Sequence, residues 1–156
     1  MNTKIDLLSL NIRHPRESGP NARELRVERI GRIIADYKPA VAGFQEVRPW
    51  WMGELGEGNR SLVDVLPENY EIFCRYRNEK DVVLKGIPER GKEGSAICYD
   101  RTVVKKLEEG AFWLSDTPSV ESQYEEDIRF TLWAKFELLV TGEQFYFRST
   151  HLGLKP

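Results

Sequence analysis

The 156-residue sequence lacks several features that mark common protein classes. It has only two cysteines, Cys74 and Cys98, which lie in apolar stretches and are too few for a disulfide-stabilised fold. We expect two buried, reduced thiols rather than a metal pair, as is usual in the cytoplasm. No stretch approaches the roughly 18 consecutive apolar residues that cross a membrane, and the N-terminus has no secretory signal pattern. These absences favour a cytoplasmic protein without membrane partners.

The sequence also lacks an excess of either charge. Its 23 Lys and Arg residues nearly balance its 25 Asp and Glu residues, which gives a formal net charge of −2. Because proteins that coat nucleic acids are usually basic, any binding of phosphate groups must depend on a local site. Several catalytic motifs are missing as well: the sequence contains no Walker loop, GxGxxG, GxSxG, HExxH or CxxC.

The hydrophobic pattern predicts a βαβ unit followed mainly by strands. Residues 4–12 and 40–47 are predicted as parallel strands, and apolar residues at helical spacing predict a helix between them, from an N-cap at Asn21 to a stop at Lys38-Pro39. A short helix is predicted at about 59–66. Further strands are predicted at 70–76, 95–99 and 103–114 (irregular at 108–110), and loops at 77–93 and 115–127. This order of elements indicates the α/β class.

The strongest strand pattern lies near the C-terminus. Every even position from Phe130 to Val140 is apolar, which is the period-2 alternation of a strand with one buried face. Residues 141–143 predict a hairpin turn, and residues 144–152 predict the partner strand.

Three polar residues follow apolar runs at the ends of predicted strands. Asn11 closes the first strand, Glu46 the second and His151 the last. Because ligands of open α/β sheets bind at the carboxyl ends of strands, these residues are the first candidates for a functional site. Each also has an ordinary interpretation, as a turn residue, an exposed carboxylate and a surface imidazole respectively. Spacing alone does not decide between the two.

The three side chains together suit one kind of chemistry. A Glu carboxylate and an Asn carbonyl oxygen are hard donors of the kind that Mg²⁺ or Mn²⁺ prefers, and Mg²⁺ fills its other positions with water and phosphate. A nearby His can donate to a phosphoryl oxygen and stabilise developing negative charge. The combination points to metal-assisted hydrolysis of phosphoesters.

Six stretches occur in a recognisable order. They are residues 8–13 (LSLNIR), 43–47 (GFQEV), 93–99 (EGSAICY), 112–118 (FWLSDTP), Arg129 with 131–134 (TLWA), and 149–152 (STHL). Together they resemble the metal-dependent endonuclease/exonuclease/phosphatase family, whose fold is that of deoxyribonuclease I. The resemblance implies a four-layer α/β/β/α sandwich, with residues 1–156 forming the N-terminal portion of a single domain of this family.

The resemblance also implies roles for the matching residues. Glu46 would be the principal metal ligand, and Asn11 would help to place the metal ion (Mg²⁺ or Mn²⁺) or the phosphate. His151 would contact the scissile phosphate, which makes Asn11, Glu46 and His151 the implied catalytic set. For Arg129, which lies in a matching stretch, a structural role is an equal alternative.

The sequence departs from the family after the histidine. Family members continue with a Gly-Asp-x-Asn motif and an Asp-His pair, which orient the phosphate and supply the general base. Here His151-Leu152 is followed by Gly153, where the family usually has Asp, and the sequence ends at Pro156. We therefore expect an incomplete sandwich and a truncated phosphoesterase that is weakly active or inactive alone. We also expect the apolar face at 130–140 to lack part of its cover and to allow self-association.

Two alternatives stay open at this point. One is a non-catalytic module that binds phosphate or nucleotide, and the other is a site assembled from two chains. The expected partner is a phosphoester substrate of unspecified type. Nucleic acid is a possible substrate, although the acidic balance of the sequence makes long DNA a poorer fit than a small phosphorylated molecule.

Overall fold

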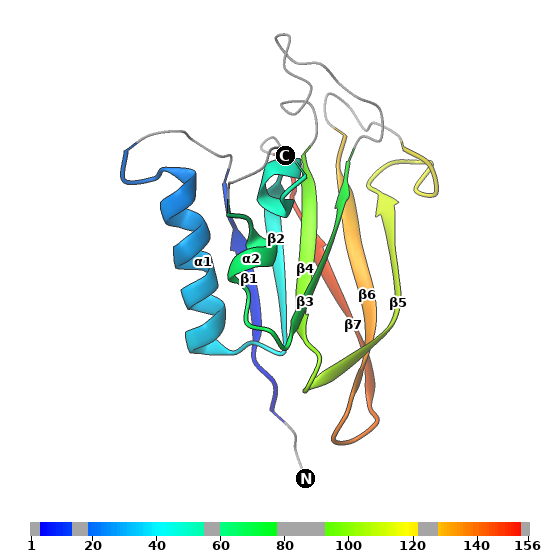
Figure 1. Ribbon diagram of the computed structural model, residues 1–156. Coiled ribbons are helices and arrows are strands. Elements are labelled where there is room, and N and C mark those ends of the chain that lie inside the picture. Colours follow the sequence, from blue (N-terminus) through cyan, green and yellow to red (C-terminus); the bar gives the residue numbers. More distant parts are fainter. Residues whose placement is uncertain (1–3, 14–18, 55–59, 78–92, 122–127, 154–156) are drawn as a thin grey trace.

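Two β-sheets pack face to face, and a long helix covers the outer side of the first sheet (Figure 1). The structure is a computed structural model, and it describes residues 4–13, 19–54, 60–77, 93–121 and 128–153. Within these ranges the chain supplies one helical layer and both sheets, which is the predicted sandwich in its incomplete form. No helix in the described ranges is both long and apolar enough to span a membrane.

The first sheet has the strand order β1-β2-β4-β3. Its strands are β1 (Leu7–Asn11), β2 (Val41–Val47), β3 (Tyr70–Tyr76) and β4 (Gly94–Asp100). The predicted parallel pairing of β1 with β2 is confirmed, whereas β4 runs antiparallel to both of its neighbours. The second sheet is antiparallel throughout, in the order β5 (Val104–Trp113), β6 (Phe130–Leu138) and β7 (Gln144–Thr150).

Helix α1 (Arg23–Tyr37) packs on the first sheet through Val27, Ile30 and Ile34 of the predicted apolar face. The prediction is wrong for Tyr37, which the helical spacing also placed on that face, because Tyr37 lies in the last turn and is 73% exposed. The helix ends as predicted, because Lys38 adopts a left-handed conformation (φ 46°) and donates its N–H to the carbonyl of Ile34 at 2.9 Å. The predicted N-cap is wrong: the cap is Ala22, and it makes no side-chain hydrogen bond. A turn that joins the N–H of Ala22 to the carbonyl of Gly19 at 2.9 Å delays the start of helical geometry by one residue.

The core between the sheets accounts for the alternating pattern of β6. Its even-numbered residues from Phe130 to Leu138 are all buried, and they pack against Val41, Ile97 and Tyr99 of the first sheet. The expectation that this face lacks cover is therefore wrong, because the first sheet already covers it. Val140, at 77% exposure, lies beyond the strand in the hairpin turn.

The region between β2 and β3 is less helical than predicted. A 3₁₀ helix, η1 (Pro49–Met52), follows β2, and helix α2 spans only Leu62–Val65 rather than 59–66. A capping box explains where α2 begins, since the N–H and hydroxyl of Ser61 both donate to Asp64, at 2.7 and 2.8 Å. Most of the two predicted loops, at 78–92 and 122–127, lies outside the described residues.

Candidate functional site

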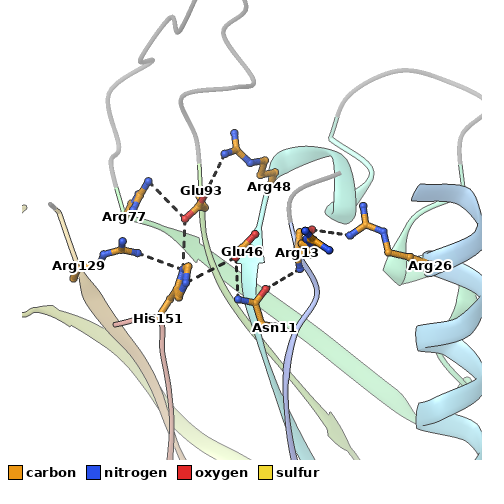
Figure 2. A network of polar contacts seen from close by, with 9 residues as sticks. All are labelled: Asn11, Arg13, Arg26, Glu46, Arg48, Arg77, Glu93, Arg129 and His151. Carbon is orange, nitrogen blue, oxygen red and sulfur yellow. Dashed lines mark hydrogen bonds and ion pairs between the residues drawn. The ribbon is translucent and has the colours of Figure 1, made fainter. Parts of the chain in front are cut away.

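The three candidate residues meet at one end of the two sheets (Figure 2). The amide Nδ2 of Asn11 donates a hydrogen bond of 2.9 Å to Oε1 of Glu46. Nε2 of His151, on the residue directly after β7, lies 3.9 Å from the same carboxylate oxygen. Residues from β1, β2 and the end of β7, separated by up to 140 positions in the sequence, therefore form one polar site.

A β-bulge in β2 aims the side chain of Glu46. The pairing of β2 with β4 shifts between Gln45 and Val47, which leaves Glu46 as the extra residue with a positive φ of 60°. Bulges bend a strand locally and redirect a side chain, and they are frequent next to active sites. The left-handed conformation costs a non-glycine residue about 1–2 kcal/mol, so the surrounding packing must hold Glu46 in this geometry.

Gln45 anchors the bulge from the side that faces the second sheet. Its Nε2 donates to the hydroxyls of Ser149 on β7 and Ser9 on β1, at 3.0 and 3.3 Å. These contacts link the three strands that carry the candidate residues. No sequence pattern points to a role for Gln45, because partners as distant as Ser149 leave no local signal.

Asn11 is fixed at both ends of its amide group. While Nδ2 binds Glu46, Oδ1 accepts the backbone N–H of Arg13 at 2.8 Å. Arg26 of α1 holds the same turn by donating to the carbonyls of Ile12 and Arg13, at 2.6 and 3.0 Å. In this geometry Asn11 orients the Glu46 carboxylate, and its predicted role as a metal ligand stays a prediction.

His151 contacts a second acidic residue and an arginine through its other ring nitrogen. Nδ1 lies 3.6 Å from Oε1 of Glu93 and 3.3 Å from Nη1 of Arg129. A guanidinium group has only donors, so the contact with Arg129 is a hydrogen bond only when Nδ1 carries no proton. In that tautomer the proton is on Nε2, the nitrogen that faces Glu46.

Two further arginines surround Glu93. Nη2 of Arg48 lies 3.0 Å from Oε2 of Glu93, in a pair whose side chains are 11% and 13% exposed, and Nη2 of Arg77 lies 3.6 Å from Oε1. Burial lowers the pKa of Arg48, while attraction to Glu93 and the hydrogen bond with it oppose that shift. Glu93 begins a matching stretch and Arg48 follows one, but no sequence pattern points to a role for either residue.

The donor set next to Glu46 is compatible with a divalent metal ion. No group of three or more His, Cys, Asp and Glu side chains in the described ranges could hold a metal ion. Mg²⁺, however, takes only one or two protein carboxylates and fills its other positions with water and phosphate. Glu46, whose side chain is 21% exposed, can supply one such ligand from the surface.

Comparison with known proteins gives matches among solved structures. No family model and no curated protein matches the sequence. The endonuclease/exonuclease/phosphatase from Bacteroides vulgatus aligns with 97% of this chain, at 23% identity and a TM-score of 0.76. The mannosyl-6-phosphatase from Bacteroides thetaiotaomicron aligns with 97% of the chain, at 25% identity and a TM-score of 0.72. The chain has the endonuclease/exonuclease/phosphatase fold.

The endonuclease/exonuclease/phosphatase fold extends to more distant structures. The catalytic domain of human Nocturnin, solved with a bound sulfate anion, aligns with 96% of this chain at 19% identity and a TM-score of 0.66. The chain covers 53%, 54% and 49% of these three structures, so it spans about half of their length.

Proposed function

We propose that the site at the strand ends hydrolyses phosphoester bonds with the help of a divalent metal ion, Mg²⁺ or Mn²⁺. The observation that carries this proposal is the convergence of Asn11, Glu46 and His151 through contacts of 2.9 and 3.9 Å. The likeness to a mannosyl-6-phosphatase and to other endonuclease/exonuclease/phosphatase proteins supports the same chemistry. The net charge of −2 favours a small phosphorylated substrate over long nucleic acid.

Each side chain has a distinct role in the proposed reaction. Glu46 holds the metal ion, and Asn11 keeps the Glu46 carboxylate in place through its 2.9 Å hydrogen bond. The bound ion would polarise the phosphoryl group and neutralise part of its charge. His151 donates from Nε2 to a phosphoryl oxygen, and the donors of Arg129 at Nδ1 favour the tautomer that can do so.

We further propose that this chain is only weakly active by itself. The second carboxylate of the site, Glu93, is within 4 Å of Arg48, Arg77 and His151. These contacts engage the Glu93 carboxylate, so it is poorly placed to accept a proton from an attacking water molecule. Metal-assisted attack by water without a strong general base is slow.

The arginines of the site favour a second candidate, a non-catalytic module that binds phosphate or nucleotide. Arg48, Arg77 and Arg129 all lie within reach of Glu93 or His151, and arginine is the side chain best suited to phosphate recognition. Binding of phosphate ligands without any turnover would support this module rather than the enzyme.

A hydrolysis assay separates the two candidates. The chain is incubated with bis(4-nitrophenyl) phosphate and with 4-nitrophenyl phosphate, in Mg²⁺ or in EDTA. We expect slow release of nitrophenol in Mg²⁺ only, and a loss of at least about tenfold in Glu46→Gln and His151→Ala, equivalent to about 1.4 kcal/mol. Glu143→Gln, in the hairpin at the far end of the sheets, is the matched control and should keep full activity (Figure 1).

Two results would contradict the enzymatic proposal. The first is hydrolysis that Glu46→Gln leaves unchanged, which would mean that Glu46 is not the essential ligand. The second is an absence of metal-dependent hydrolysis together with measurable phosphate binding, which would establish the binding module instead.

A further inference from the structure

A pocket opens beside the imidazole of His151, on the side of its Nδ1 atom. Its volume is about 10 Å³, and it is open to solvent. Arg77, Glu93, Arg129 and His151 form its polar wall, while Ile128 and Phe130 form its apolar wall. Glu46 and Asn11 do not line it, so this pocket is separate from the position proposed for the metal ion.

The charges around the pocket favour an anion. Glu93 makes its closest contact with Arg48, at 3.0 Å, and its contact with Arg77 is longer, at 3.6 Å. Among the described residues that line the pocket, Arg77 and Arg129 carry positive charges and Glu93 carries a negative one. Guanidinium groups only donate hydrogen bonds and match the geometry of oxyanions, so the pocket has more donors than acceptors.

A buried hydroxyl gives independent support. Ser95 is 1% exposed and lines the pocket, yet its Oγ has no hydrogen-bond partner among the described residues. Buried polar groups are almost always paired, because an unpaired one loses its contact with water and gains nothing in return. An oxygen atom of a bound oxyanion would accept the hydrogen bond that Ser95 can donate.

One short segment fixes both arginines that line the pocket. The indole Nε1 of Trp113 donates to the backbone carbonyl of Arg77 at 3.1 Å, and the N–H of Leu114 donates to the carbonyl of Arg129 at 2.8 Å. The N–H of Arg77 also donates to the carbonyl of Glu93 at 2.9 Å. The backbone on both sides of the pocket is therefore ordered before any ligand binds, which reduces the entropic cost of binding.

We propose that this pocket binds a second phosphate group of a small phosphorylated substrate, while the first phosphate lies between Glu46 and His151. The proposal rests on the proposed function for the position of the first phosphate. The pocket is small and open to solvent, which suits one compact anionic group rather than a whole drug-sized ligand. Arg77, Arg129 and Ser95 would donate to it.

Calorimetry with analogues that cannot be hydrolysed tests the second subsite. The full chain is titrated at low salt with methylphosphonate and with propane-1,3-diyl bisphosphonate, first in Mg²⁺ and then in EDTA. We expect the bisphosphonate to bind at least about tenfold more tightly than methylphosphonate, a difference of about 1.4 kcal/mol in binding free energy. This is more than the twofold gain that a ligand with two equivalent phosphonate groups has at a single site. In Arg77→Met this preference should fall below about threefold, while the affinity for methylphosphonate changes less than twofold.

Two further variants control for charge and folding. Arg101→Met removes an arginine that is 50% exposed and pairs with Glu71, and it should keep the full preference for the bisphosphonate. Ser95→Ala changes no charge and should lower the preference about threefold. The thermal unfolding of each variant shows that it is folded, so that a lost preference reports on the pocket.

The results that overturn the inference are distinct from those that overturn the proposed function. Equal affinity for the two phosphonates, or a preference that persists in Arg77→Met, would exclude the second subsite. The chain is also titrated with a 5′-phosphorylated thymidine dinucleotide. If only this dinucleotide binds more tightly than methylphosphonate in a way that depends on Arg77, the ligand is a nucleic-acid strand rather than a small phosphorylated molecule. Affinities that are the same in Mg²⁺ and in EDTA would count against the metal ion at Glu46, and the Arg77-dependent preference would still stand.

Discussion

Replacing Glu46 by glycine should give a more stable protein than replacing it by alanine. Glu46 has a φ of 60° at the bulge of β2, in the left-handed region that favours glycine. Both substitutions remove the carboxylate and the hydrogen bond from Asn11, so these losses cancel when the two variants are compared. The remaining difference between the variants reports on the backbone of Glu46.

The size of the effect follows from two opposing terms. Alanine keeps the cost of the left-handed conformation, about 1–2 kcal/mol. Glycine removes that cost but loses about 0.5–1 kcal/mol of additional conformational entropy on folding. The glycine variant should therefore be more stable by about 0.5–1 kcal/mol, which corresponds to a melting temperature about 2–4 °C higher for each kcal/mol in a chain of this size.

The assay is urea unfolding followed by the fluorescence of the four tryptophans. Glu137, on β6, is the matched control because its φ is not positive. At Glu137 glycine should be less stable than alanine by about 0.5–1 kcal/mol, so the sign of the difference reverses between the two sites. If glycine is also the less stable variant at Glu46, the bulge geometry described above is incorrect.

Three other perturbations have defined outcomes. Gly94→Ala places a Cβ atom in collision with the backbone carbonyl oxygen of Arg75, so it should lower the free energy of unfolding by about 2–3 kcal/mol. An unchanged melting temperature would refute the close approach of β3 and β4. Burial raises the pKa of Cys98 to about 12 in the folded protein, so this thiol ionises at a lower pH in the unfolded state. The free energy of unfolding should therefore fall as the pH rises from about 9 towards 12. Between pH 8 and 10, the free energy of unfolding measured in urea should fall less steeply with pH for Cys98→Ala than for the unchanged protein. Equal slopes for the two proteins would contradict the raised pKa of Cys98. Asn11→Ala should weaken Mn²⁺ binding about tenfold in calorimetry by releasing the Glu46 carboxylate, and an unchanged affinity would mean that Asn11 does not position it.

The strands and the long helix could be predicted because periodicity reports burial directly. The alternation from Phe130 to Leu138 and the helical spacing in α1 both correspond to faces that are buried in the structure. Element ends were harder to predict, because local hydrogen bonds decide them. The turn at Gly19 moved the start of α1, and the capping box of Ser61 and Asp64 set the start of α2.

The candidate site was predictable only in part, for a different physical reason. Asn11, Glu46 and His151 could be proposed because each follows an apolar run, and the structure brings them together. Their surroundings depend on contacts between distant positions, such as the hydrogen bond from Gln45 to Ser149 across 104 residues and that from Arg48 to Glu93 across 45. Neither contact leaves a periodic pattern in the sequence.

A titration with Mn²⁺ followed by amide NMR tests most directly whether the strand ends form a metal site. Paramagnetic Mn²⁺ broadens the signals of nearby nuclei, so the position of the ion can be read from the amides that broaden first. Substoichiometric Mn²⁺ should broaden the amides of Asn11, Glu46 and His151 before that of Gly142 in the distant hairpin, and Glu46→Gln should abolish this selectivity. Uniform broadening along the chain, or the same selective pattern in Glu46→Gln, would contradict a metal site at Glu46.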